Sequence, residues 1–240
     1  MEFDLENAGS GLEQQNLEGT EIGEAASLEP KLMDVPGMGE VLVGGDPYGI
    51  ADQLDCEQGD NVLNAGGDCG LVSVANIAVE AGLNVTEDEV VILAVGNGLC
   101  EYSTELDSAE NGGTNAWNQS ILLGALGIPS TVFSDLDGSK LNPNQIADYV
   151  ESGHGVAIHI NAGYAWNDAA AIDDGSVNHS VTVTGTVRDP ETNELKGLIV
   201  CDSGVPGNTS AVVLDLNTLQ DAYTNAEGSC AIITDQPVRA

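Results

Sequence analysis

The order of helical and extended patterns in this 240-residue chain predicts an α+β fold, in which a helical half packs on a mainly antiparallel sheet. Apolar runs of helical type come first along the chain, and alternating runs typical of strands come later. A polar turn joins two of the alternating runs into a hairpin, which makes those strands antiparallel. A chain of this length can bury one sizeable core.

The elements are expected in the following order. The expected helices are residues 71–81, 86–95, 115–126, 142–151 and 216–223. Thr86 and Glu89 have the spacing of a capping box, Thr114 is expected to cap the third helix, and Asn142-Pro143 starts the fourth. The expected strands are residues 127–133, 155–160, 179–187, 197–202, 211–214 and 230–234.

Cys69 is the first candidate for a functional side chain. It stands in Gly67-Asp-Cys-Gly-Leu71, at or just before the start of the first helix. Unpaired backbone N–H groups and the helix dipole stabilise an anion there, so the thiol should ionise more readily than a free one. A small lead-in of Ala and Gly lets other backbone approach closely. The simpler alternative is a half-buried Cys at the start of a core helix.

His179 and Asp202 are the candidate partners of this thiol. His179 heads the first strand of the hairpin and Asp202 ends the second, and the midpoint between them falls in the turn, at residues 190–191. Such a hairpin places the two side chains opposite each other. An imidazole oriented by a carboxylate can take the proton of a thiol, which is the nucleophile–base–orienter arrangement.

The order of Cys69, a distant His179 heading a strand and Asp202 ending the next strand resembles the papain-like cysteine peptidases. Asp68-Cys69-Gly70 at the helix start is most similar to the bacterial double-glycine peptidases that process leader peptides. The resemblance covers about residues 50–235. It implies that Cys69 is the nucleophile, His179 the base and Asp202 the orienting residue, in the hydrolysis of a peptide or isopeptide bond through an acyl-enzyme.

An oxyanion donor is the remaining part that the resemblance implies. The family has a Gln a few residues before the Cys, and the nearest candidates here are Asn64 and Gln58. We assign the role to Asn64, because its side-chain amide can donate to a developing oxyanion.

The other histidines are not expected to be catalytic: His154 is interpreted as a turn residue and His159 as a sheet residue. Trp117, Tyr164 and Trp166 are candidates for the wall of a substrate cleft, with rim or core packing as the alternative.

The N-terminal 45 residues are poor in apolar periodicity and predict an acidic flexible tail or pro-segment, followed by a domain over residues 46–240. Gly44-Gly45 has the loose shape of a double-glycine leader, with a Gly-rich linker as the alternative. The expected partners are therefore a protein or peptide substrate and, within the chain, this pro-segment.

Charge restricts the other partners. The chain has 39 acidic residues against 5 Lys and Arg, a formal net charge of −34. Such a surface repels nucleic acid and anionic membranes, so nucleic-acid binding is not expected. Neither a membrane-spanning run nor a signal peptide is visible. The alternatives for localisation are retention in the cytoplasm, export by a route without such a signal, and origin in a larger chain.

Cysteine spacing bears on metals and redox state. No Cys-x-x-Cys pair occurs, so neither a zinc cluster nor another cofactor is expected. The four remaining cysteines are expected to form two bridges or none, and Cys201 and Cys230, in apolar runs, are expected to be buried thiols.

Two other functions stay open: a transglutaminase or glutamine deamidase effector domain, which uses the same thiol chemistry, and a non-catalytic domain that binds leader peptides.

Overall fold

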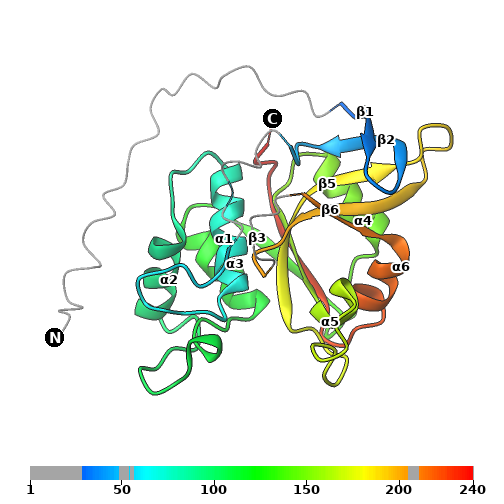
Figure 1. Cartoon of the computed structure of the whole chain (residues 1–240). Helices are drawn as coiled ribbons and strands as arrows, with labels where there is room; N and C mark the ends of the chain where they lie inside the picture. Colours follow the sequence, from blue (N-terminus) through cyan, green and yellow to red (C-terminus); the bar gives the residue numbers. More distant parts are fainter. Residues whose placement is uncertain (1–28, 49–53, 55–56, 205–210, 240) are drawn as a thin grey trace, which may run out of the picture.

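The computed structural model describes residues 29–48, 54, 57–204 and 211–239. Within these residues an eight-stranded sheet has the order β1-β2-β5-β4-β8-β3, and β6 and β7 extend it from the other side of β5 (Figure 1). All of its strand pairs are antiparallel. The strands are β1 (Lys31–Val35), β2 (Gly39–Gly45), β3 (Ser130–Ser134), β4 (Val156–Ile160), β5 (His179–Arg188), β6 (Leu195–Cys201), β7 (Val212–Asp215) and β8 (Cys230–Thr234).

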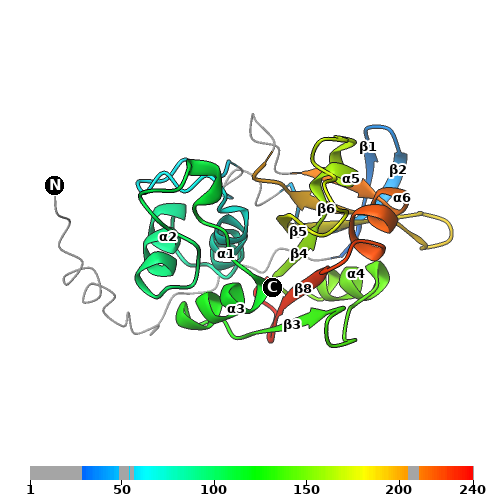
Figure 2. The ribbon, with the colours of Figure 1, turned by 90° about the horizontal axis from the view of Figure 1, so that it is seen from below.

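The helices lie on the two sides of this sheet, as the predicted α+β class requires. Figures 1 and 2 show α1, α2 and α3 on one side, and α4, α5 and α6 on the other. Their bounds are α1 (Cys69–Glu80), α2 (Glu87–Gly96), α3 (Ala116–Ala125), α4 (Pro143–Glu151), α5 (Ala162–Trp166) and α6 (Leu216–Leu219), and a π-helical turn, Gln220–Thr224, continues α6.

Alternation along the central strands builds two cores. In β4, Val156, Ile158 and Ile160 pack with α4 and α6, whereas Ala157 between them packs with the α1–α3 layer. Strand β8 alternates in the same way, because successive side chains of a strand point to opposite faces. The two faces of one sheet therefore carry separate hydrophobic clusters.

The helix starts largely follow the local sequence. Thr86 and Glu89 form the predicted capping box of α2, and Asn142 caps α4 with Pro143 in its first turn. The cap of α3 is Asn115, whose side chain accepts from the N–H of Asn118. Thr114 was the wrong choice, because its hydroxyl donates to the carbonyl oxygen of Leu99 instead.

Residues 31–45 correct the predicted boundary at residue 46. They form the hairpin β1–β2, and β2 pairs with β5 from Leu42↔Arg188 to Gly45↔Gly185. Val35, Val41 and Val43 are buried against β5 and β6. Gly44 and Gly45 are therefore sheet residues in this structure and do not form a flexible processing site. The pairing is long-range, which a search for local periodicity does not detect. Residues 1–28 of the expected tail lie outside the described residues.

The β5–β6 hairpin forms as predicted, but in a different register. The pairs run from Arg188↔Leu195 to Thr182↔Cys201 with two irregularities, so His179 and Asp202 are not directly opposite. Continuing the register by one residue puts Asp202 opposite Val181. Because His179 and Val181 share a strand face, His179 and Asp202 become diagonal neighbours on that face, a separation that long side chains can span.

Candidate active site

Helix α1 begins at Cys69, as the sequence predicts. The lead-in is tightly packed: the N–H groups of Gly66 and Gly67 donate to the carbonyl oxygens of Ser108 and Asn111. A Cβ atom on Gly67 would lie 2.5 Å from the carbonyl oxygen of Ala109, so only glycine fits there. The glycines thus fix the path of the chain immediately before the thiol.

The structure brings Cys69, His179 and Asp202 together. The Nε2 atom of His179 lies 2.5 Å from Oδ1 of Asp202. The side chain of His179 is also hydrogen-bonded to the thiol of Cys69. Since Nε2 faces the carboxylate, Nδ1 is the ring nitrogen that remains for the sulfur. Three side chains from α1, β5 and the end of β6 therefore form one hydrogen-bonded chain.

This arrangement favours the thiolate–imidazolium form of the pair. Burial would raise the pKa of the Cys69 thiol, but the hydrogen bond and positive charge of His179 outweigh it and lower that pKa below its ordinary value. Burial would lower the pKa of His179, but its hydrogen bonds to Asp202 and Cys69 raise it instead. A nucleophile with a depressed pKa beside a charged imidazole is the state that thiol chemistry requires.

Backbone next to Asp202 holds the carboxylate in place. Its Oδ1 also accepts from the N–H of Gly204 at 2.9 Å, while Oδ2 is buried with no hydrogen-bond partner among the described residues. A Cβ atom on Gly204 would lie 3.2 Å from Cε1 of His179, so a side chain here would press on the imidazole. Gly204 leaves this side of the ring open.

Two serines connect α1, which begins at Cys69, to β5, which begins at His179. The hydroxyl of Ser73 donates to the carbonyl oxygen of Cys69 at 2.9 Å, and its oxygen lies 3.1 Å from the hydroxyl of Ser180. A hydroxyl has one hydrogen, so Ser180 is the donor in that second contact. Both serines are buried. The pair fixes α1 against β5 one turn below Cys69.

His159 lies near the site but belongs to its support. Its Nε2 is 2.9 Å from the amide nitrogen of Gln119, a fully buried residue of α3. Burial and the charge of His179 lower the pKa of His159 to about 4, so its ring is neutral. His154 is bonded through Nδ1 to the carbonyl oxygen of Thr234. His179 is the histidine that the structure joins to Cys69.

A pair of carboxyl groups lies on the other side of Cys69. Asp68 is fully buried and is hydrogen-bonded to Glu87 at the start of α2. The N–H of Gly59 donates to both carboxyl groups, and so does the side-chain amide of Asn61. Burial is the main reason that the pKa of Asp68 rises to about 6. A hydrogen bond between two carboxyl groups requires that one of them carries the proton.

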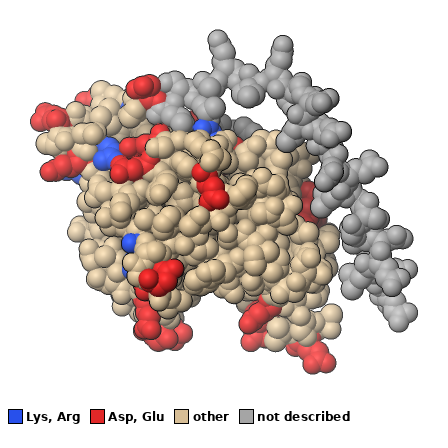
Figure 3. All heavy atoms as spheres, turned by 180° about the vertical axis from the view of Figure 1, so that it is seen from behind, with Lys and Arg blue, Asp and Glu red and all other residues tan. Residues whose placement is uncertain are grey.

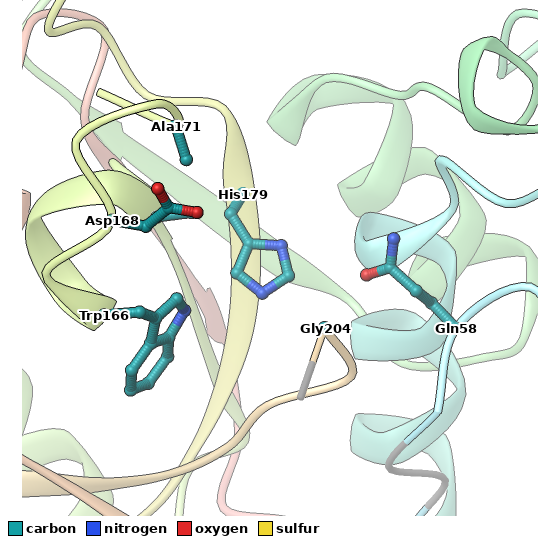
Figure 4. A pocket seen from close by; sticks show the side chains of 7 residues that line it. Gln58, Trp166, Asp168, Ala171, His179 and Gly204 are labelled. Carbon is teal, nitrogen blue, oxygen red and sulfur yellow. The ribbon is translucent and has the colours of Figure 1, made fainter. Parts of the chain in front are cut away.

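A cavity of about 360 Å³ opens beside His179. Figure 4 shows Trp166 and Asp168 on one side of the imidazole and Gln58 on the other. The Gln58 amide nitrogen donates to the carbonyl oxygen of Gly66 at 2.8 Å, and its oxygen accepts from Ser203. Asn64 is exposed on a turn with a left-handed φ of 53°. The structure gives the choice of Asn64 over Gln58 no support.

The three aromatic candidates for the wall of the cleft lie in three different places. Trp166 lines the cavity beside His179, whereas Tyr164 lines a second, acidic pocket and Trp117 is an exposed residue of α3. Residues 162–166 form the short helix α5, which is not among the elements expected from the sequence. The α5 helix is too short for a periodic signal. The cap of Asn161 on the N–H of Tyr164 was the available local clue.

The other cysteines lie apart from this chain of hydrogen bonds. Cys100 and Cys230 have free thiols, and Cys201 and Cys230 are buried in β6 and β8 as predicted. Cys56 lies outside the described residues.

Among residues 29–48, 54, 57–204 and 211–239, no group of three or more His, Cys, Asp or Glu is placed to hold a metal ion. No helix in these ranges is long and apolar enough to cross a membrane.

Comparison with known proteins places the fold. No family model and no curated protein matches the sequence. A putative C39-like peptidase from Bacillus anthracis has a similar structure, with a TM-score of 0.50 and 16% identity over 75% of this chain and 94% of that chain. The fold is papain-like. A double-glycine motif protease from an AMS/PCAT transporter, solved in complex with its leader peptide, matches with a TM-score of 0.43 and 18% identity over 70% of this chain and 84% of that chain.

The papain-like fold explains why the three residues of the site come from two different layers of the molecule. The helical layer supplies Cys69 and the sheet supplies His179 and Asp202, so the reactive group forms only where the two meet. The sequence predicts these three residues, which the structure brings together, but not the place of Gln58 in the cavity or the contact of Asp68 with Glu87. Gln58 was one of the two candidates for the oxyanion donor, and Asn64 was preferred to it.

Proposed function

We propose that the protein hydrolyses peptide or isopeptide bonds through a thioester formed on Cys69, with His179 as acid and base and Asp202 as the orienting residue. The hydrogen-bonded chain from Asp202 through His179 to Cys69, at the start of α1, is the observation that carries the proposal. The papain-like fold supports it, because it accounts for all three positions together.

The first half of the reaction forms the thioester. The Cys69 thiolate attacks the carbonyl carbon of the scissile bond, and the carbonyl oxygen becomes an oxyanion. His179 then gives its proton to the leaving nitrogen, the C–N bond breaks, and the amine departs. Asp202 keeps the imidazole in the orientation in which Nδ1 faces both sulfur and leaving nitrogen.

The second half releases the product. His179, now neutral, takes a proton from water, and the resulting hydroxide attacks the thioester carbon. The C–S bond breaks, the carboxylic acid leaves, and the thiolate–imidazolium pair is restored. An amine in place of water would give transamidation by the same steps, so the acceptor that enters the cavity decides between the two outcomes.

Gln58 is our proposed side-chain donor to the oxyanion, in place of Asn64. Its amide nitrogen has two hydrogens, and the carbonyl oxygen of Gly66 accepts one of them. The other is available toward the cavity that Gln58 shares with His179. The backbone N–H of Cys69 is a natural second donor, because N–H groups in the first turn of a helix need no intrahelical partner. Removing such a donor typically lowers kcat about 10²–10³-fold.

The proposal is tested by thiol reactivity and by turnover. At neutral pH, iodoacetamide should alkylate Cys69 before Cys100 and Cys230, because burial raises the pKa of those two thiols to about 11 and about 12. Peptide mapping by mass spectrometry identifies the modified residue. A proteome-derived peptide mixture then reports cleavage, with the products also searched for new amide bonds to added amines.

Substitution assigns the roles. Cys69→Ala and His179→Ala should abolish turnover, whereas Asp202→Asn should leave a remnant, since the nucleophile and base act as one unit. His159→Gln and His154→Gln are the matched controls for loss of a histidine and should retain activity. Faster alkylation of another cysteine, or full turnover in His179→Ala, would refute the proposal.

A further inference from the structure

The wall formed by Trp166 and Asp168 has no part in the bond-breaking steps, yet it borders the same cavity as His179. In Figure 4 both side chains lie across the imidazole from Gln58. The general acid must reach the leaving nitrogen, so the departing part of the substrate lies on the His179 side of the nucleophile. The Trp166–Asp168 wall therefore borders the leaving segment.

Several contacts hold this wall in a defined position. Asn161 caps α5 and donates through its side chain to the carbonyl oxygens of Ile172 and Ser176. Asn178, next to His179, accepts from the N–H of Ala162 and donates to the carbonyl oxygen of Ala171. The segment that contains Trp166 and Asp168 is thus tied at both ends to the base of the β5 strand. Its side chains are placed relative to the imidazole.

Asp168 presents a carboxylate that forms no ion pair with a Lys or Arg among the described residues. Its Oδ1 accepts from the N–H of Ala170 at 3.0 Å, which fixes the side chain in a turn. Four of the five Lys and Arg are engaged elsewhere: Arg188 with Glu151, Lys196 with Asp189, Arg239 with Glu80, and Lys140 with two backbone carbonyls. The fifth, Lys31, lies in β1, which pairs with β2 away from α5. The imidazolium of His179 borders the same cavity but is engaged by Asp202 and Cys69, so the substrate is the remaining source of a cation for Asp168.

We propose that Trp166 and Asp168 form a subsite for a basic residue, Lys or Arg, in the leaving segment of the substrate, immediately after the scissile bond. The inference rests on the proposed hydrolysis. The indole contacts the methylene chain and the face of the cation, and the carboxylate pairs with its charge. Trp166 is half-buried and Asp168 is exposed to water, so the preference over an uncharged residue is expected to be about three- to tenfold.

Acyl transfer measures this subsite without knowledge of the natural substrate. The full-length enzyme is acylated with benzyloxycarbonyl-Gly-Gly 4-nitrophenyl ester, and lysine amide, norleucine amide or glutamate amide then competes with water for the thioester. By microscopic reversibility, each amide binds where the leaving segment lies. The ratio of aminolysis to hydrolysis, read by chromatography, should be highest for lysine amide. Equal ratios for lysine amide and norleucine amide would overturn the proposal.

Variants separate the subsite from the overall negative charge. Asp168→Asn keeps the acceptor for Ala170 but should reduce the preference for lysine amide over norleucine amide to less than about twofold. Asp168→Lys should favour glutamate amide. Asp221→Asn removes an equal charge in the separate pocket beside Tyr164 and should keep the wild-type preference.

The outcomes are distinct. An unchanged preference in Asp168→Asn, or an equal loss in Asp221→Asn, would overturn the subsite while leaving the hydrolysis intact. Failure of the wild type to release 4-nitrophenol in a burst that Cys69→Ala lacks would refute the proposed function, and the subsite with it.

Discussion

The carboxyl groups of Asp68 and Glu87 illustrate how single residues determine the behaviour of this site. They share a proton in a buried position next to Cys69, and both accept from Gly59, the neighbour of Gln58. Loss of that proton would place two negative charges side by side in a site that is otherwise arranged to stabilise a thiolate. The protonation state of this pair therefore depends on pH and affects the segment that precedes Cys69.

The first prediction concerns the pH dependence of stability. The pKa of Asp68 is about 6 in the folded protein, above its usual value near 4, so the folded state binds the proton more tightly. This contribution is complete below about pH 4 and is lost as pH rises through about 6. Asn resembles the protonated acid. Asp68→Asn should thus match the wild type near pH 4 and exceed it by about 3 kcal/mol near pH 8.

Urea unfolding across this pH range measures the difference between the two proteins. Glu191→Gln, in the exposed β5–β6 turn, is the control for loss of one negative charge. A difference that does not change with pH would contradict the shared proton.

At the level of single residues, the sequence indicated the chemistry but not its support. Cys69, His179 and Asp202 were identified because each stands at the end of a predicted element. Gln58 was set aside in favour of Asn64, and the contact of Asp68 with Glu87 was not predicted, because both depend on a loop that folds back on α2, which no local pattern records. Asn64 was chosen because its side-chain amide can donate to an oxyanion, and the exposed, left-handed turn at that residue could not be seen from the residue type.

Among the elements, the contact between α1 and β5 is the one on which the site depends. Ser73 and Ser180 meet at 3.1 Å in a buried position, and Ser73 also binds the carbonyl oxygen of Cys69. The hydroxyl pair therefore sets the distance between the helix that begins at Cys69 and the strand that begins at His179.

We expect Ser73→Ala to lower the free energy of unfolding by about 1–2 kcal/mol, because it leaves the hydroxyl of Ser180 buried without its acceptor. Ser180→Ala should cost less, since Ser73 keeps the carbonyl oxygen of Cys69. Both variants should lower kcat several-fold with little change in KM. A double-mutant cycle on stability and turnover measures the coupling, and strict additivity would show that the contact does not position Cys69.

The elements that were missed share a cause. The β1–β2 hairpin and the register of β5–β6 are set by long-range pairing, and α5 is set by a single cap and a turn. The helices α1, α2 and α4 carry their own periodicity and capping residues, so they could be predicted. The bulges in β5–β6 moved Asp202 from the predicted opposite position to a diagonal one, and the side chains still met.

At the scale of the whole molecule, residues 31–45 belong to the fold, because they form the β1–β2 hairpin that pairs with β5. Removal of residues 1–45 would take away buried Val35, Val41 and Val43 and uncover Val187 and Ile199. At about 1.5 kcal/mol per valine, the loss is about 4 kcal/mol, or a decrease in Tm of about 10 °C. Calorimetry of this truncation is the test, and removal of residues 1–28 is its control. An unchanged Tm after removal of residues 1–45 would show that the hairpin is dispensable.

The surface charge acts on the same scale. Figure 3 shows acidic side chains in several groups around the rim of one face, with few basic ones among them. With a net charge of −34, repulsion among these groups opposes compaction and weakens as salt screens it. Stability measurements on variants should therefore be compared at one fixed ionic strength.

The two hydrophobic clusters on opposite faces of the sheet have a practical consequence for following the protein in solution. The ionisation of Cys69 depends on His179, which a different layer of the molecule holds in place. A small displacement of the helical layer relative to the sheet would leave every helix and strand intact. It would still separate Cys69 from His179, and the thiol would then become protonated. The rate at which Cys69 reacts with a thiol reagent therefore reports the relative position of the helical layer and the sheet. It should fall before circular dichroism detects any loss of secondary structure.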